Sequence, residues 1–229
     1  RIMPESTLFP PNTFQQPWDK YALQMSLKLL ISQQIKTEYY VTLDADIILH
    51  SPLSYSNFVR DGHAFYDLEN RGVHEDWWRG SAQILNVAYE DESDTASPVN
   101  GFGVTPAVLS TAGALFTLHR LQANHDQFDW ITNWSQYWWS EYSAYRITLD
   151  QTKTFSRLYD YQRSHFPRND SSLSCENVWF GNEVWTPSNV FEKRKNICDD
   201  EVCEVQNCVF SVIQSTSGAS PKLVADNIT

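Results

Sequence analysis

The segment Tyr39-Tyr-Val-Thr-Leu-Asp44-Ala-Asp46-Ile-Ile-Leu-His50 joins a run of β-forming residues to two acids that are one residue apart. The alternation of side chains across residues 39–43 predicts a β-strand. Asp44 and Asp46 follow this strand at its carboxyl end, where ligands gather in open α/β sheets. Two carboxylates this close repel each other, and a hard divalent cation relieves the repulsion. We therefore expect Asp44 and Asp46 to form a metal site that holds a phosphate-bearing substrate.

Strands and helices alternate on both sides of this segment. The first predicted helix, residues 18–34, carries Leu23, Leu27, Leu30 and Ile31 at helical spacing. A later helix is expected to start with Thr105 as N-cap and Pro106 at the first helical position. Further predicted elements are a strand at 62–67, an amphipathic stretch at 82–89, an aromatic-rich helical region at 126–148 and a strand at 208–214. This alternation predicts an α/β fold with a mainly parallel sheet flanked by helices.

The composition restricts the class of partner and the location of the chain. The 229 residues carry a formal net charge of -11, which argues against nucleic acid or an anionic membrane as partner. The sequence has no run of 18 apolar residues, so we expect no membrane span. Its four cysteines lack Cys-x-x-Cys spacing, which favours two disulfides over a zinc cluster. Disulfides indicate the lumen of the secretory pathway or the extracellular space; a reducing cytoplasm with four separate thiols is the alternative.

The Asp-x-Asp motif is compatible with two chemistries. One is glycosyl transfer, in which a metal bridges the diphosphate of a nucleotide sugar and stabilises the leaving group. The other is phosphoryl transfer of the haloacid-dehalogenase type, with Asp44 as nucleophile, Asp46 as general acid and residues 199–200 as the late acidic pair. That motif usually continues with a small residue and Thr or Val, whereas Ile47 and Ile48 follow here. We therefore place the phosphatase second.

Four motifs in order extend the first interpretation. They are Gln24-x-x-x-Lys28-Leu, the Asp-x-Asp segment, Gly103-Val-Thr-Pro106 and Ser140-Glu141-Tyr142-x-x-Tyr145. This set resembles the GT-A glycosyltransferases, and most closely a poorly characterised nucleotide-diphosphosugar-transferase-like family. The resemblance covers about residues 1–150. It implies a GT-A-like, Rossmann-like fold and transfer of a sugar from a nucleotide diphosphate to a glycan or other hydroxyl acceptor.

The resemblance also implies how the donor is held. Asp46 would bind Mn²⁺ or Mg²⁺ directly, while Asp44 would lie nearer the ribose and the waters of the metal. Lys28 would contact the phosphates as a point charge, and Gln24 would lie beside it on the same helix. A solvated lysine on a helix is the alternative for Lys28. His165 is a candidate third metal ligand, because some relatives of this type use a late histidine.

The implied catalytic residue is Glu141, as the general base for the acceptor hydroxyl. A glutamate favoured by the helix dipole, with Ser140 as cap, is its structural alternative. Asp129 is the substitute candidate for the base. Gly103 is expected to allow close approach of the donor sugar or the acceptor to the backbone.

The nine tryptophans leave a third interpretation open. The adjacent pairs Trp77-Trp78 and Trp138-Trp139 could stack on sugar rings, although tryptophan is also ordinary core material. Because neighbours on a helix point in different directions, at most one of each pair is expected to meet a ligand. A carbohydrate-binding module without turnover is therefore the non-enzyme alternative.

Domain organisation follows from the position of the motifs. We expect a catalytic region over residues 1–165 and a cysteine-containing segment over 166–229 packed on the same domain. A GT-A domain begins with a nucleotide-base-binding unit well before its Asp-x-Asp motif, yet only 43 residues precede Asp44. The expectation is therefore a fragment truncated at its N-terminus.

Overall fold

A computed structural model describes residues 2–9, 20–49, 52–66, 69–88, 101–103, 105–125, 129–160, 174–178 and 210–213. The chain divides into two compact units. The first unit combines Arg1–Thr42 with Asp61–Ser164, and the second combines Leu43–Arg60 with His165–Thr229. Each unit is thus assembled from two separate segments of the chain. The predicted regions 1–165 and 166–229 stay a prediction.

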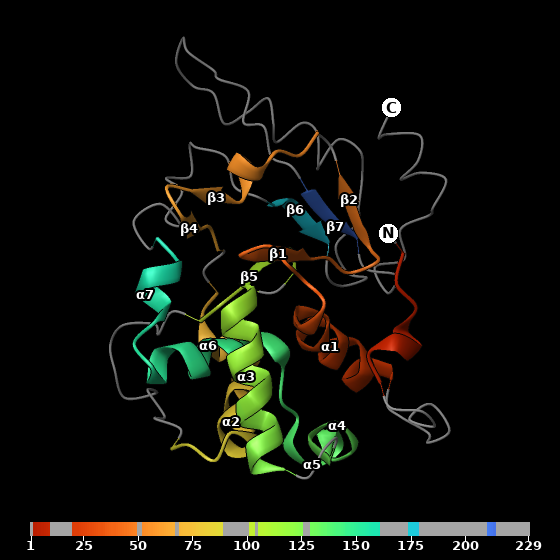
Figure 1. Ribbon diagram of the computed structural model, residues 1–229, viewed down its shortest axis with the longest axis vertical. Coiled ribbons are helices and arrows are strands. Elements are labelled where there is room, and N and C mark those ends of the chain that lie inside the picture. The colour runs from red at the N-terminus through yellow and green to blue at the C-terminus, as the bar shows by residue number, and fades with distance from the viewer. Residues whose placement is uncertain are drawn as a thin grey trace. The chain divides into compact units, whose positions relative to one another are not determined.

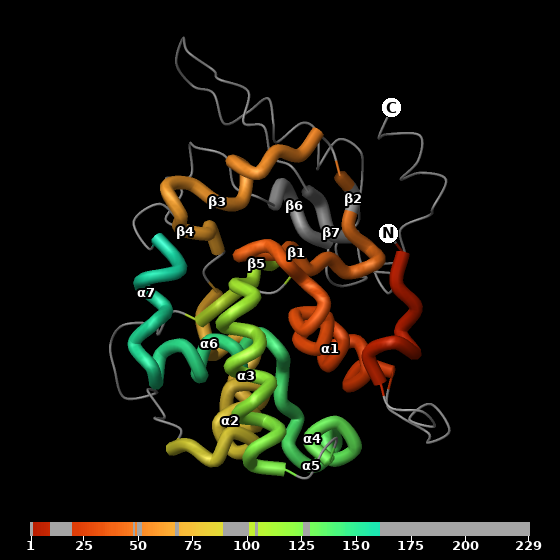
Figure 2. The backbone as a smooth tube through the Cα atoms, viewed as in Figure 1, coloured from red at the N-terminus to blue at the C-terminus, as the bar shows by residue number. Residues whose placement is uncertain are grey.

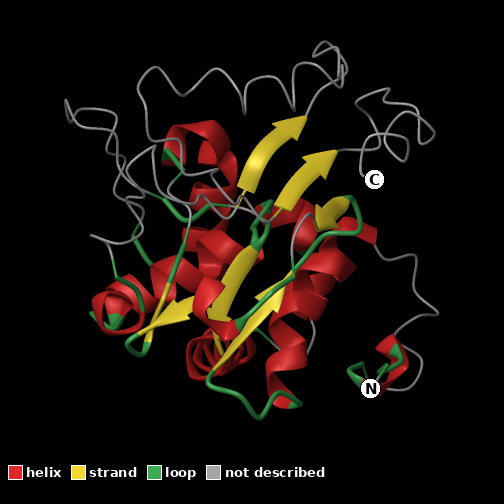
Figure 3. Ribbon diagram, turned by 90° about the horizontal axis from the view of Figure 1, so that it is seen from above, coloured by secondary structure: helices red, strands yellow, loops and turns green. Residues whose placement is uncertain are grey.

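The first unit is mainly helical (Figures 1 and 3). Its helices are α1 (Lys20–Leu30), α2 (Glu75–Ile84), α3 (Thr111–Asn124), α4 (Asp129–Thr132), α5 (Trp134–Tyr137), α6 (Glu141–Gln151) and α7 (Phe155–Leu158). Its strands are β1 (Tyr39–Thr42), β4 (His63–Ala64) and β5 (Ala107–Ser110), and its short 3-10 turns are Glu5–Thr7, Ile31–Gln33 and Arg71–His74. The helix predicted at 18–34 is confirmed by α1 and the 3-10 turn that follows it.

Strands β1 and β5 form an antiparallel pair in which Tyr39 faces Ser110 and Thr42 faces Ala107. The pairing continues one residue further, at the start of α3. Thr111 N–H donates to the carbonyl of Glu38 at 2.8 Å, which ties the end of β5 to the residue before β1. Helices α1 and α3 therefore meet the strand pair at the same end, and they pack side by side (Figure 1).

The antiparallel pairing of β1 and β5 corrects the predicted sheet direction, while the predicted α/β class is confirmed. The alternation of strands and helices suggested a mainly parallel sheet, but it fixes only the order of the elements. In the part of the chain described above, β1 and β5 run antiparallel and a mainly parallel sheet is not formed. The mixed α/β class itself is confirmed.

The predicted helix start at Thr105 and Pro106 is wrong. The Thr105–Pro106 bond is cis, and Pro106 leads into strand β5 instead of a helix. Helix α3 begins five residues later, at Thr111, where the Ser110 hydroxyl accepts a hydrogen bond from Gly113 N–H at 3.4 Å. Ser110 is therefore the N-cap, because a serine hydroxyl satisfies an N–H group that the first helical turn leaves open.

Helix α6 lies at the centre of the first unit, where α2 and α3 both pack against it (Figure 2). Two glycines allow close approach in this region, Gly80 toward the end of α5 and Gly113 toward α6. A Cβ atom on Gly80 of α2 would overlap the carbonyl oxygen of Tyr137, and one on Gly113 of α3 would lie 2.9 Å from the ring of Tyr145. Tyr145 is fully buried, and its hydroxyl accepts from Ser110 N–H at 3.0 Å.

The second unit contains β2 (Ile47–Leu49), a 3-10 turn at Tyr55–Asn57, β3 (Val59–Arg60), β6 (Ser174–Val178) and β7 (Phe210–Ile213). Strand β7 lies between the other two members of a three-stranded sheet, antiparallel to β2 and parallel to β6. The strand predicted at 208–214 is confirmed by β7. None of the helices in the described ranges is long and apolar enough to cross a membrane.

Candidate functional site

The candidate site is built around a buried ion pair between α1 and α6. Lys28 lies in the last turn of α1, where a positive charge is favoured by the helix dipole. Glu141 is the first residue of α6, where a negative charge is favoured for the same reason. Their side chains meet with Nζ 2.9 Å from Oε1, and only 11% of the lysine and 4% of the glutamate side chain is exposed.

Tyr142 and Thr42 complete one side of this pair. The Lys28 ammonium lies 4.9 Å from the centre of the Tyr142 ring, within the range of a cation–π interaction. The Tyr142 hydroxyl is 2.9 Å from Thr42 Oγ1, and Thr42 is the last residue of β1. The ion pair is thereby connected to the carboxyl end of the strand that leads into Asp44.

Tyr40 supports the pair from the middle of β1. Its hydroxyl donates to the backbone carbonyl of Lys28 at 2.7 Å. Burial, followed by the charges of Tyr145, Tyr142 and Glu141, raises the pKa of Tyr40 well above its usual value. Tyr40 is therefore a neutral hydrogen-bond donor throughout the physiological range, and it fixes the end of α1 relative to β1.

Asp44 and Asp46 lie in the second unit, just after β1 ends. Both side chains are half-buried. The Asp44 carbonyl accepts from Ile47 N–H at 3.3 Å, so the two acids lie in a turn that leads into β2. The described residues contain no group of three or more His, Cys, Asp or Glu side chains that could hold a metal. Asp44 and Asp46 thus offer two carboxylates, which leaves other coordination positions to a substrate and water.

The other predicted site residues are more scattered. Gln24 is exposed on α1 one turn before Lys28, and Asp129 is exposed at the start of α4. Gly103 is buried in an irregular segment before β5. His165 lies outside the described residues, and so do Cys198, Cys203 and Cys208; Cys175 lies in β6, whose side chains are not described.

The tryptophan pairs divide between core and surface. Trp78 and Trp139 are buried, with 2% and 0% exposure, whereas Trp138 is 55% exposed. Trp77 is half-buried and contacts Tyr21, which is itself 41% exposed, at a ring separation of 6.2 Å. Tyr21 also meets the edge of Trp134 at 5.6 Å, and Trp134 lies 5.1 Å from Trp138. We call Tyr21, Trp77, Trp134 and Trp138 the aromatic surface.

Glu69 and His74 form a second titratable pair, which no sequence motif predicted. Burial raises the pKa of Glu69 to about 7 and lowers that of His74. The His74 Nε2 and Glu69 Oε1 atoms are 3.8 Å apart, too far for a hydrogen bond, so desolvation outweighs their attraction. His74 also stacks on Trp77 at 3.9 Å. Glu69 precedes a short turn, and neither helical nor strand periodicity surrounds it. The neighbouring residues therefore do not indicate that its side chain is buried.

Comparison with known proteins gives a family but no function. A family profile described as "Family of unknown function (DUF6492)" matches residues 1–229. The chain belongs to this family. Neither the curated proteins nor the solved structures contain a match. In this DUF6492 member, the structure brings the predicted site residues Lys28 and Glu141 into direct contact.

Proposed function

We propose that this DUF6492 protein is a metal-dependent glycosyltransferase that moves a sugar from a nucleotide diphosphate to a hydroxyl acceptor. The observation that carries the proposal is the buried Lys28–Glu141 pair beside the end of β1. Two separate sequence motifs predict the roles of these residues: Lys28 as a contact of the phosphates and Glu141 as the general base. A GT-A-like fold remains part of the proposal, although its support is the order of the motifs and not the direction of the strands.

The Asp-x-Asp segment follows β1 directly in the chain. Asp44 is two residues after Thr42, so their Cα atoms are within about 7 Å of each other in any arrangement of the chain. Thr42 in turn lies 2.9 Å from Tyr142, the neighbour of Glu141. In this proposal the sequence motifs assign Asp44 and Asp46 to the metal and Lys28 to the phosphates.

Two half-buried aspartates fit a magnesium or manganese ion that also binds phosphate. Mg²⁺ is typically held by one or two protein carboxylates, while substrate phosphates and water fill the remaining positions. Asp46 would be the direct ligand, and Asp44 would contact the metal waters and the ribose. When bound, the metal would neutralise the charge that develops on the diphosphate leaving group.

Lys28 and Glu141 have complementary roles in this proposal. Lys28 would stabilise the negative phosphates as a positive charge that is already fixed by Tyr142 and Glu141. Glu141 would accept the proton of the acceptor hydroxyl as that oxygen attacks the anomeric carbon of the sugar. Its buried position lowers the exposure of this step to water. Asp129 remains the substitute candidate for the base.

The aromatic surface is the proposed acceptor side. Tyr21, Gln24 and Lys28 are spaced by three and four residues, so they share one face of α1. This face leads from the ion pair to Tyr21 over about 10 Å of helix. Faces of tyrosine and tryptophan rings are suited to stacking on sugar rings, and here two of them are substantially exposed.

The test is release of nucleotide diphosphate from a panel of nucleotide sugars, with and without Mn²⁺. We expect hydrolysis that requires the metal and is lost in Asp46→Asn. Asp61→Asn is the matched control, because Asp61 is exposed in a turn with positive φ that asparagine also adopts. Activity that survives Asp46→Asn would contradict the proposal.

Glu141→Gln tests the base, in a variant whose folding is checked by circular dichroism because Glu141 also holds Lys28. We expect it to reduce transfer to an acceptor by about 100-fold or more while donor hydrolysis changes less. A trapped aspartyl-phosphate on Asp44, formed from a phosphomonoester, would instead identify a phosphatase. Glycan binding that is insensitive to EDTA and to both Asp44→Asn and Asp46→Asn, without turnover, would identify a carbohydrate-binding module.

A further inference from the structure

A pocket lies in the first unit, between the end of α6, the start of α7 and the segment after β4. Its volume is about 280 Å³. Three aromatic side chains, Tyr66, Phe155 and Tyr159, provide its apolar walls, and Arg146, Asp150 and Lys153 provide its charged groups. This size admits a small molecule with a flat or apolar body.

The charge around the pocket is the reverse of the charge of the chain. Arg146 Nε donates to both carboxylate oxygens of Asp150, at 2.9 and 2.8 Å. Arg71 also contacts Asp150, with Nη2 3.4 Å from Oδ2. One carboxylate therefore faces two guanidinium groups, and Lys153 adds a third positive charge at the rim. This excess of positive charge stands out in a protein with a net charge of -11.

Arg146 retains donor capacity that Asp150 does not use. Its Nη1 atom is buried and donates no hydrogen bond within the part of the chain that the structure describes. A buried guanidinium N–H without an acceptor is unfavourable, and an oxygen atom of a ligand would relieve this cost. The guanidinium plane is also held in place, because its Cζ atom lies 3.5 Å from the centre of the Phe155 ring. Arg146 is thus oriented to accept an anion.

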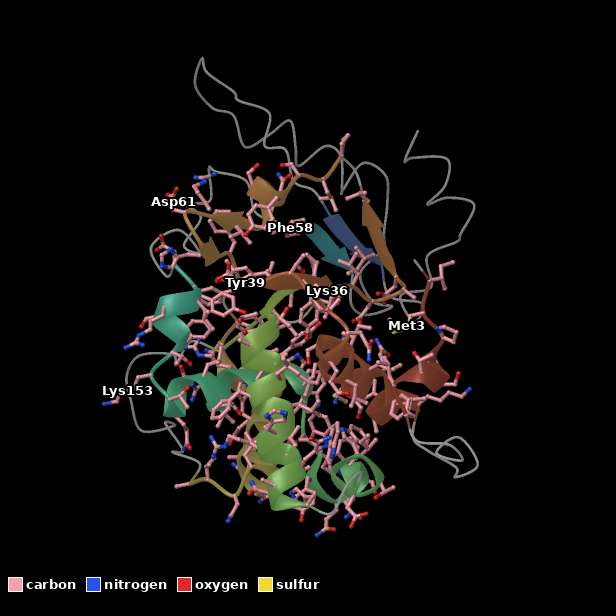
Figure 4. The ribbon with its side chains drawn as sticks, viewed as in Figure 1. Met3, Lys36, Tyr39, Phe58, Asp61 and Lys153 are labelled. Carbon is pink, nitrogen blue, oxygen red and sulfur yellow. The ribbon has the colours of Figure 1, made fainter. Side chains whose placement is uncertain are left out.

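Lys153 lies where it can complete the site. It follows α6 with a φ of 55° and is exposed, and Figure 4 shows it at the edge of the first unit near α7. Its ammonium is a point charge on a flexible stem, so it can reach an anion over the pocket.

We infer that this pocket binds a small molecule in which an oxyanion, a phosphate ester or a carboxylate, is attached to a flat apolar body. The oxyanion contacts Arg146 and Lys153, and the body packs against Phe155 and Tyr159. The pocket is distinct from the proposed glycosyltransfer site. Arg146 is five residues after Glu141, so the two side chains leave α6 about 140° apart around the helix axis.

The experiment is calorimetric titration of the full chain with four probes: phenyl phosphate, benzoate, inorganic phosphate and benzyl alcohol. We expect saturable binding of phenyl phosphate or benzoate, weaker binding of inorganic phosphate and none of benzyl alcohol. The comparison of the first two probes identifies the type of oxyanion. Binding should also weaken as salt is raised, since the contacts are ionic.

Two variants connect the binding to the pocket. Lys153→Asn removes the charge and retains a residue that tolerates positive φ, so we expect about ten-fold weaker binding and an unchanged fold. Lys20→Asn, at an exposed lysine in α1, is the control for loss of one positive charge and should bind as the parent does. Arg146→Lys should also weaken binding, because an ammonium cannot reproduce the two-pronged contact of a guanidinium.

The inference is overturned if no anionic probe binds saturably, or if Lys153→Asn and Arg146→Lys both bind as tightly as the parent chain. Nucleotide-sugar hydrolysis is measured on the same variants. Because the two sites use different residues, hydrolysis should persist in Lys153→Asn whether or not the pocket binds its probe.

Discussion

The Lys28–Glu141 pair gives the sharpest prediction for the stability of the first unit. At 2.9 Å and an effective dielectric constant of about 20, two unit charges attract by about 6 kcal/mol. The removal of both side chains from water offsets much of this attraction, since only 11% and 4% of them remain exposed. Loss of one partner removes an opposite charge 2.9 Å away from a buried group, so Glu141→Gln or Lys28→Met should cost about 3–5 kcal/mol in free energy of unfolding.

A double-mutant cycle measures the pair itself. Lys28→Met combined with Glu141→Gln removes both charges, so the double variant should be more stable than the sum of the two single losses by about 2 kcal/mol or more. Urea unfolding followed by circular dichroism gives the free energies, and hydrogen exchange of α1 and α6 shows where protection is lost. If each single variant loses less than 1 kcal/mol and the coupling is near zero, the pair does not hold α1 and α6 together.

Three further predictions concern the same unit. Because burial raises the pKa of Glu69 from 4.5 to about 7, the folded chain binds more protons than the unfolded chain in this interval, and stability falls as pH rises through it. Glu69→Gln should remove this loss and raise the free energy of unfolding at pH 8 by about 2–3 kcal/mol; an unchanged pH profile in urea unfolding would contradict the assignment. Gly80→Ala should destabilise the unit by about 3 kcal/mol or more, because the new methyl group would overlap the last carbonyl of α5; a melting temperature equal to that of the parent would show that α2 can move away. Trp139→Leu should cost about 3 kcal/mol, whereas Trp138→Asn, at an exposed position with positive φ, should change stability by less than about 1 kcal/mol; equal losses in thermal unfolding would refute this division.

Sequence patterns predicted the individual helices and strands more accurately than the contacts between them. The hydrophobic spacing of α1 and the β-forming run before Asp44 identified both elements, because each depends on local side-chain preferences. The buried face of α1 differs from the predicted stripe. Leu23 and Leu27 are half-buried, while Met25 and Leu29 are fully buried, since the position of α3 and α6 decides which face is covered.

The sequence could not show strand direction or the ion pair. The antiparallel direction of β5 is a property of its pairing with β1, which joins residues far apart in the chain. Lys28 and Glu141 belong to separate sequence motifs. Each also has a structural alternative, a solvated lysine on a helix and a glutamate favoured by the helix dipole. Their pairing depends on the packing of α1 against α6, which neither motif encodes. The same is true of Arg146, whose burial reflects Phe155 beneath it.

The discontinuous second unit has a consequence for synthesis of the chain on the ribosome. The residues of strand β2 are synthesised early, yet its hydrogen-bonding partner is β7, with Leu49 opposite Phe210. The edge of β2 therefore has no β7 partner until most of the chain has been translated. Pairings between such distant segments fold slowly and leave strand edges open to other chains in the interval. We expect nascent chains that stop before Phe210 to depend on chaperones more than the complete protein does.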